Sequence, residues 1–227
     1  VQADGLFAAF ARTPLLESID VDDANQNYQS LDGVLYTKGL THLATYPQAK
    51  NSGGSYTVAE ETAFIDEGAF ASAQITSVTL PDSLRDIKDE AFRLSALTAV
   101  TLPEKFETVG TCAFCSADKL ATIDLGGTIS LGGSAFESTS AKNGVNFRPE
   151  LGRLTTIGDF AFSRTAVPTV SLPDSVTTVG EQAFSESTAL TSFHIGAGVT
   201  SFAETALYND RKIATLTVSA DNPLYSA

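Results

Sequence analysis

The sequence predicts a β-rich repeat solenoid with one parallel β-sheet, short helical turns and a small β-meander insertion. Three observations predict this fold class. The dipeptide Ala-Phe recurs at intervals of 22 to 26 residues from Phe70 onward, and a short alternating apolar run follows most copies. The interval from Phe10 to Phe70 is instead 60 residues long, so an additional segment enters the array there.

The Ala-Phe dipeptide gives each repeat a fixed reference point. Because a unit of about 22 residues cannot bury its own apolar face, we expect the units to stack into a single solenoid over residues 1–227, with about seven coils. Each Phe is predicted to point inward and stack on the next Phe, and each Ala to let adjacent turns approach closely. The copies are Ala9-Phe10, Ala69-Phe70, Ala91-Phe92, Ala113-Phe114, Ala135-Phe136, Ala161-Phe162, Ala183-Phe184 and, with Leu in place of Phe, Ala206-Leu207.

Each repeat is predicted to supply one short strand, as at 77–80, 99–102 and 169–172. These segments alternate apolar and polar residues and are rich in β-branched side chains, which is typical of a half-buried strand. Pro81, Pro103 and Pro173 follow them and end the strands, because proline has no N–H for a ladder. A second extended piece then leads to the Ala-Phe segment, where we expect one or two helical turns.

The insertion is predicted to be a small β-meander over residues 22–57. Val21 and Val58 both occupy the position at which a repeat strand ends, so the intervening residues enter the array at one point. Asp32-Gly33 predicts a tight hairpin turn, and Lys38-Gly39 predicts a second turn.

Composition excludes several classes of partner. The net charge is −13, and nucleic-acid binding needs clustered Lys and Arg, so we expect no nucleic-acid partner. The chain is 43% hydrophobic, enough for a sizeable core, but no run of 18 apolar residues occurs, so we expect no membrane insertion in this segment.

Motifs for metal or catalytic chemistry are sparse, and we expect no catalytic residue, metal site or cofactor. Cys112 and Cys115 form a C-x-x-C motif, but both flank the Phe of an ordinary repeat, and His42 and His194 are far apart in sequence. We interpret the cysteines as two thiols or a local disulfide. The segment "DVDDANQN" lacks the Gly and Glu of an EF-hand loop and is expected to be a solvated turn.

The candidate binding site is a row of outward-facing strand positions, one per repeat. Alternation places these residues on the solvent face, beside a second row of small residues two positions earlier. Exposed strand positions favour Thr in any protein, so the pattern also fits a surface without a ligand. The outward row, which we call the outward ladder, comprises Thr79, Thr101, Asp124, Asn146, Ser171, His194 and Thr217. The earlier row comprises Ser77, Ala99, Thr122, Thr169, Ser192 and Thr215.

The repeat resembles the BspA-like, Treponema-type leucine-rich repeats. The resemblance rests on "LPDSLRDIKDEAF", "LPDSVTTVGEQAF", the strands "LTAVTL", "LATIDL" and "LTSFHI", and the interrupting segment "NYQSLDGVLYTKGLTHLATYP". It implies a right-handed leucine-rich-repeat coil and an extracellular, cell-surface protein of bacterial or protozoan origin. It also implies adhesion, with a host or microbial surface protein or glycan as partner.

Three functional readings follow. The first is a non-enzymatic, monomeric surface protein that binds proteins or cells. The second is a structural stalk that presents other modules, and the third is a glycan-acting hydrolase.

The end of the sequence repeats the start of the insertion. "VDDANQNY" begins at Val21 and "VSADNPLY" begins at Val218. We therefore expect the sequence to break off inside a second meander, with a D-G hairpin following within about ten residues.

Overall fold

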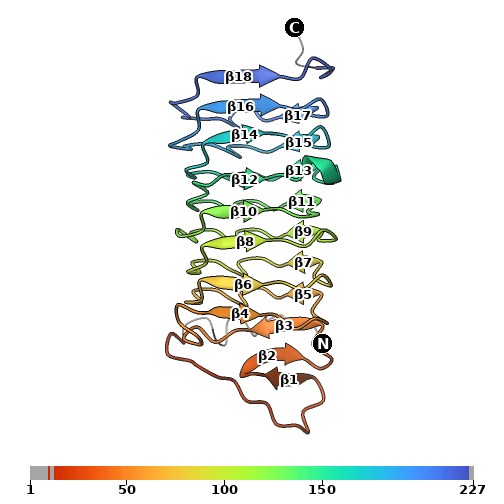
Figure 1. Ribbon diagram of the computed structural model, residues 1–227, viewed down its shortest axis with the longest axis vertical. Coiled ribbons are helices and arrows are strands. Elements are labelled where there is room, and N and C mark those ends of the chain that lie inside the picture. The colour runs from red at the N-terminus through yellow and green to blue at the C-terminus, as the bar shows by residue number, and fades with distance from the viewer. Residues whose placement is uncertain (1–9, 11–12, 225–227) are drawn as a thin grey trace.

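The computed structural model describes residues 10 and 13–224 and shows a β-solenoid of about eight turns. Two faces run along it (Figure 1). One is a single ten-stranded sheet, and the other is divided into sheets of two, three and three strands. The ten-stranded sheet contains β1 (Tyr28–Leu31), β2 (Val34–Thr37), β3 (His42–Thr45), β5 (Phe64–Ile65), β7 (Asp86–Ile87), β9 (Thr108–Val109), β11 (Ser130–Leu131), β13 (Thr156–Ile157), β15 (Thr178–Val179) and β17 (Ser201–Phe202).

The second face carries the strands that the alternating runs predict. It contains β4 (Ser55–Thr57) and β6 (Ser77–Thr79); β8 (Ala99–Thr101), β10 (Thr122–Asp124) and β12 (Val145–Asn146); and β14 (Thr169–Ser171), β16 (Ser192–Ile195) and β18 (Thr215–Val218). All pairs within these three sheets are parallel, as expected.

The expectation of one parallel sheet needs correction, because this second face is interrupted. Between β6 and β8 the coils remain joined by Thr98, whose N–H donates to the Thr76 carbonyl at 3.1 Å. Between β12 and β14 the second face is interrupted because of Pro168. In most other coils the residue just before the strand donates to the coil below, as Ala121 does to Thr98 at 2.9 Å. Pro168 occupies this position before β14 and has no N–H to give.

The N-terminal end is a meander that passes directly into the solenoid. β1 and β2 pair antiparallel around Asp32-Gly33, and both turn residues have positive φ, as a tight hairpin turn requires. β3 pairs antiparallel with β2 but parallel with β5, and β4 pairs parallel with β6. Residues 42–57 of the predicted insertion therefore form a coil of their own, which is why the structure has about eight turns where the repeats predicted about seven.

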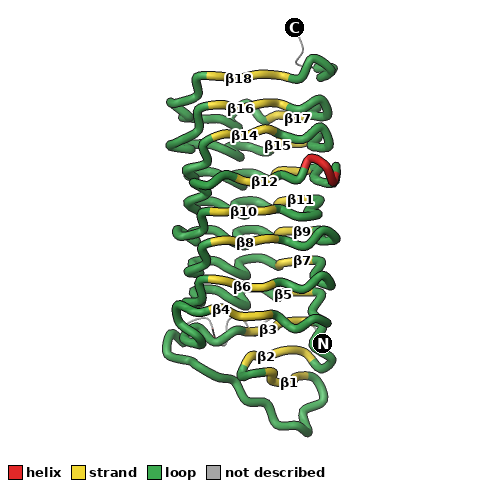
Figure 2. The backbone as a smooth tube through the Cα atoms, viewed as in Figure 1, coloured by secondary structure: helices red, strands yellow, loops and turns green. Residues whose placement is uncertain are grey.

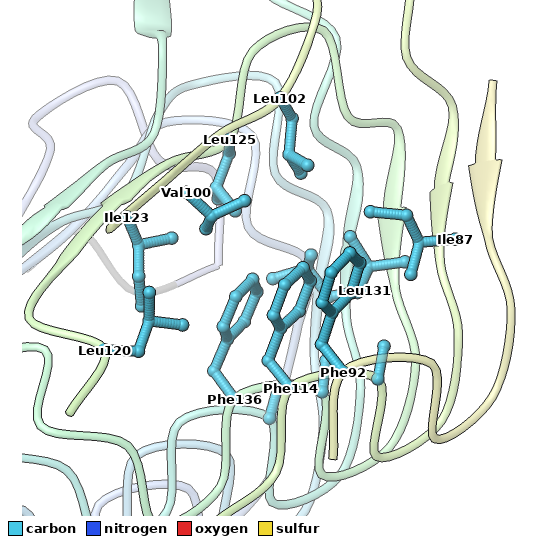
Figure 3. Packing of buried hydrophobic residues seen from close by; sticks show 14 of the residues in the cluster. Ile87, Phe92, Val100, Leu102, Phe114, Leu120, Ile123, Leu125, Leu131 and Phe136 are labelled. Carbon is cyan, nitrogen blue, oxygen red and sulfur yellow. The ribbon is translucent and has the colours of Figure 1, made fainter. Parts of the chain in front are cut away.

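The core is a continuous stack of the repeated phenylalanine rings (Figure 3). Adjacent centroids from Phe70 to Phe184 lie 4.7–5.3 Å apart, with interplanar angles of 1–11°. Aliphatic side chains from both faces pack around the rings, as Figure 3 shows for Ile87, Val100 and Ile123. The six stacked rings are those of Phe70, Phe92, Phe114, Phe136, Phe162 and Phe184, and all are fully buried.

Tyr46, not Phe10, continues this stack below Phe70. The Tyr46 ring lies 4.8 Å from that of Phe70, and its N–H donates to the Ala69 carbonyl. Phe10 instead lines a small pocket beside Tyr46 and Leu16. Ala9, its partner in the predicted first copy, lies outside the described residues, as does Tyr225 of the expected second meander.

The Ala-Phe segments are turns, which corrects the expectation of helical turns. Figure 2 shows 3-10 helix η1 (Pro149–Leu151) as the single helical element of the described chain. In the turn around Phe70, Gly68 and Ser72 both have positive φ, a conformation that interrupts a right-handed helix. The Phe70 N–H donates to the Ala91 carbonyl of the next coil at 2.7 Å, so these segments bond between coils. This close approach accounts for the small side chain at Ala91.

Candidate binding face

The structure places all seven residues of the outward ladder on one face of the solenoid, in strands β6 to β18 (Figure 1). They lie in register: Thr101 is paired with Asp124 and Asp124 with Asn146, while Ser171 is paired with His194 and His194 with Thr217. Asp124 and His194 are half-buried, and the others are exposed. The neighbouring row of small residues is in the same register, so the two rows form a regular array of short polar side chains.

The centre of the ladder contains a charged cluster that the repeat pattern does not predict. Asp124 accepts hydrogen bonds from Arg148 Nε at 2.7 Å and from Asn146 Nδ2 at 3.1 Å. Arg148 also contacts Glu150, at 3.2 Å between Nη1 and Oε1. The hydrogen bond to Asp124, followed by that to Glu150, raises the pKa of Arg148 above its usual value. The carboxylates of Asp124 and Glu150 therefore neutralise the Arg148 guanidinium, which lies next to the small side chains of the ladder.

This cluster lies in the longest repeat. The interval from Phe136 to Phe162 is four residues longer than the usual 22. Its additional residues accommodate Arg148, which has a left-handed φ of 49°, and η1, which follows it directly. Phe147 turns inward and packs edge-to-face on Phe162 at 5.9 Å. The longer repeat therefore projects η1 from the edge of the solenoid, as Figure 1 shows beside β12 and β13.

His194 belongs to the ladder rather than to a catalytic arrangement. Its Nδ1 lies 2.9 Å from Thr217 Oγ1 on the next coil. That neighbour is a hydroxyl, whereas a Ser-His-acid triad requires a carboxylate at this nitrogen to orient the ring. The geometry thus shows His194 hydrogen-bonded along the ladder, without the carboxylate of such a triad at its Nδ1.

The ten-stranded sheet carries a second polar group that the sequence reasoning did not identify. The His42 Nδ1 atom lies 2.8 Å from Asp66 Oδ1, and the His42 ring stacks on Phe64 at 4.6 Å. Lys88 Nζ lies 5.0 Å from the centroid of the Phe64 ring and 3.1 Å from Asp86 Oδ2. The signal that could have found this cluster is the pair of positions just before and just after the inward residue of the odd-numbered strands, which recur at about the same interval as the ladder.

The remaining motifs have structural roles. Cys112 and Cys115 are joined by a disulfide, with 4.7 Å between their Cα atoms, in the turn that contains Phe114. In the "DVDDANQN" segment, Asn25 Oδ1 accepts the N–H groups of Asn27 and Tyr28, and Asp22 Oδ1 accepts that of Ala24. These are Asx turns, in which the side chain bonds the backbone of its own loop.

Two features are missing from the part of the chain that the structure describes. No group of three or more His, Cys, Asp or Glu residues is placed to hold a metal ion. No helix in that part of the chain is long and apolar enough to cross a membrane.

Comparisons with known proteins agree with this architecture. The family model described as "BspA type Leucine rich repeat region" matches residues 50–155 and 155–224, in six copies. A leucine-rich repeat protein from Eubacterium ventriosum has a similar structure, with a TM-score of 0.59 and 23% sequence identity over 78% of this chain and 54% of that one. The pneumococcal vaccine antigen PcpA is similar with a TM-score of 0.58 and 19% identity, over 89% of this chain and 50% of that one.

At these identities the two structures show the fold alone, and the chain spans about half of their length. A comparison with curated proteins found no match. The family model, however, covers most of the sequence, and its copies fall on the stacked coils. The chain therefore belongs to the BspA-type leucine-rich repeat family.

Proposed function

We propose that this chain is a non-enzymatic, monomeric cell-surface protein that binds another macromolecule through the outward ladder. The observation that carries the proposal is the regular array itself, in which polar side chains from seven successive coils, five of them exposed, lie on one face that is formed by three sheets of parallel strands. Extended solenoid faces of this kind suit long partners, because each coil adds one more contact position.

A protein or glycan at a host or microbial surface is the partner we propose. The family to which the chain belongs supports an extracellular, surface location, as does its likeness to a pneumococcal vaccine antigen. The net charge of −13 disfavours nucleic acid. The two alternative functions predict different results from a binding protein. A structural stalk shows no specific binding, and a glycan-acting hydrolase turns over its substrate.

An array of surface proteins and glycans, probed with the purified chain, tests the proposal. We expect saturable binding to one or more of them and no product release from a glycan panel. Binding to none of the array supports the stalk, and turnover of a glycan supports the hydrolase. Either result contradicts the proposal.

A long cationic side chain on the ladder, next to Asp124, is expected to weaken this binding. Thr101→Arg places a long cation on β8, where Thr101 is exposed between β6 and β10. We expect affinity for the partner from the array to fall at least about tenfold, or about 1.4 kcal/mol, in a titration. The free energy of unfolding should change by about 0.5 kcal/mol or less, because the position is on the surface.

Thr108→Arg is the matched control for that experiment. Thr108 is also exposed and also on a strand, but it lies in β9 of the ten-stranded sheet. Equal loss of binding in both variants would assign the effect to charge in general and refute the ladder as the site.

The disulfide is expected to be dispensable for binding. It joins residues only three apart in sequence, so it constrains the unfolded chain little, and replacing both cysteines with serine should lower the free energy of unfolding by about 2 kcal/mol at most. Binding should also survive a zinc chelator and a thiol-blocking reagent. An interaction that is lost on chelation and restored by added zinc contradicts this prediction.

A further inference from the structure

A depression of about 310 Å³ lies in the two turns that lead into β16 and β18, in adjacent coils (Figure 1). Pockets that hold small ligands begin at about this volume, roughly 300 Å³, so one sugar-sized group fits here. All of its lining residues are polar or charged. They are Glu186, Ser187 and Thr188 from the first turn and Asn209, Arg211 and Lys212 from the second.

Hydrogen bonds between the two turns hold this depression in shape. The Glu186 N–H donates to the Tyr208 carbonyl at 2.9 Å, and the Ser187 N–H donates to Asp210 Oδ1 at 2.7 Å. Asp210 does not line the depression, and its Oδ2 is buried. A ligand therefore meets turns that are already joined, and little order has to be gained on binding.

Two of the lining side chains are held in place by neighbouring polar groups. Asn209 Oδ1 accepts a hydrogen bond from Arg211 Nε at 2.7 Å, which leaves both Nη groups of the guanidinium free to donate. Glu186 Oε2 lies 3.5 Å from Arg164 Nε, so the Glu186 charge is compensated and its Oε1 remains an acceptor. A guanidinium whose orientation is fixed loses less freedom when it binds a carboxylate.

Lys212 adds a second cation beside Arg211. Both residues are exposed, and neither forms an ion pair within the described part of the chain. Adjacent cations without a carboxylate partner are unexpected in a chain with 14 Lys and Arg against 27 Asp and Glu. In the turn after Phe114, the equivalent positions hold Asp118 and Lys119, so an acidic side chain replaces the arginine there.

We propose that this depression binds a sugar carboxylate, as carried by a uronic acid or a sialic acid residue of a glycan. Arg211 offers the carboxylate a bidentate pair of N–H groups, and Lys212 adds a charge-assisted hydrogen bond. Glu186 only accepts hydrogen bonds, so it favours a ligand with hydroxyl donors over a multiply charged group such as phosphate. The exposed Thr188 hydroxyl and the Asn209 amide are further partners for the sugar ring. This proposal is independent of the ladder and of its partner.

A nuclear magnetic resonance titration of the ¹⁵N-labelled chain tests the site. The two probes are methyl β-D-glucuronide and the methyl glycoside of N-acetylneuraminic acid. With at least one of them, we expect saturable shifts confined to the amides of residues 186–188 and 209–212. Methyl β-D-glucoside, which lacks the carboxylate, should bind at least about tenfold more weakly, as should the acidic sugar to Lys212→Gln, because each change removes a hydrogen bond to a charged group.

Lys119→Gln is the matched control, since Lys119 is exposed and occupies the position equivalent to Lys212. It should leave the affinity unchanged. Arg211→Asp reproduces the Asp118–Lys119 pair and should abolish binding while the amide spectrum keeps its dispersion.

Three results overturn the proposal. The first is that neither acidic sugar shifts these amides, and the second is that methyl β-D-glucoside binds as well as the acidic sugars. The third is equal binding of acetate, which would show that the depression takes any carboxylate, including that of an acidic peptide.

Discussion

Replacing Phe92 with alanine is expected to lower the free energy of unfolding by about 3–5 kcal/mol, the usual range for a buried aromatic residue. Phe92 is fully buried, and its ring lies 4.7 Å from that of Phe70 and 5.0 Å from that of Phe114. The substitution removes both ring contacts and leaves a cavity in the middle of the stack. Neighbouring coils cannot close this cavity, because inter-coil hydrogen bonds fix their spacing on both sides. Denaturant melts measure the effect.

Thr101→Ala is the control for this measurement. Thr101 is exposed on β8, and the change should cost about 0.5 kcal/mol or less. Equal effects of Phe92→Ala and Thr101→Ala would show that the inside and outside of the coil have been assigned wrongly.

The second large effect is expected from a glycine at the corner between the two faces. A Cβ atom on Gly132 would lie 2.7 Å from the carbonyl carbon of Gly110 and 2.7 Å from the Thr111 nitrogen. Both are backbone atoms of the coil below, so neither can rotate away. We expect Gly132→Ala to destabilise the chain by about 1–3 kcal/mol, as overpacking does in cores, measured by denaturant unfolding.

Gly133 supplies a matched control one residue away. A Cβ there meets only the Asp159 carbonyl oxygen, at 3.5 Å, which is an ordinary contact. Gly133→Ala should therefore change the free energy of unfolding by about 0.5 kcal/mol or less. If the two substitutions are equally harmful, or equally harmless, the close approach of coils at this corner is not what requires glycine.

Much of the solenoid was predictable because one spacing repeats along the chain. Residues at the same position of successive coils contact one another. The recurrence of Phe70, Phe92 and Phe114 therefore indicates by itself a stack of rings. Alternation likewise places Thr79 and Thr101 on the solvent side of their strands. Both inferences depend on periodicity alone, which is the strongest signal that a single sequence contains.

The first coil was not predictable, because its residues break that spacing. Tyr46 takes the place of phenylalanine in the stack, and it follows Leu43 by three positions, whereas Phe70 follows Ile65 by five. The segment therefore looked like part of an insertion.

The turns were mispredicted for a related reason. Ala and Phe suit a helix, but the residues two positions before and two positions after each stacked Phe have a positive φ, which a right-handed helix does not allow. A glycine at position 68 indicates such a positive φ in the sequence, whereas Glu90 and Cys112 have a positive φ at the equivalent position although neither residue type indicates it.

The candidate site combines predictable and unpredictable parts. The ladder follows from alternation, since each of its residues lies one position beyond an inward side chain. The Asp124–Arg148 contact does not, because Arg148 belongs to the additional residues of the longest repeat and has no counterpart in other coils.

A crystal structure of the 227-residue chain tests the central claim most directly, which is that the repeats are stacked coils sharing one core and presenting one ladder. The expected result is parallel pairing of β8 with β10, with Thr101 opposite Asp124, above an unbroken row of phenylalanine rings from Phe70 to Phe184. Two separate cores, or antiparallel pairing among the strands that end near Leu80, Leu102 and Leu125, would contradict it.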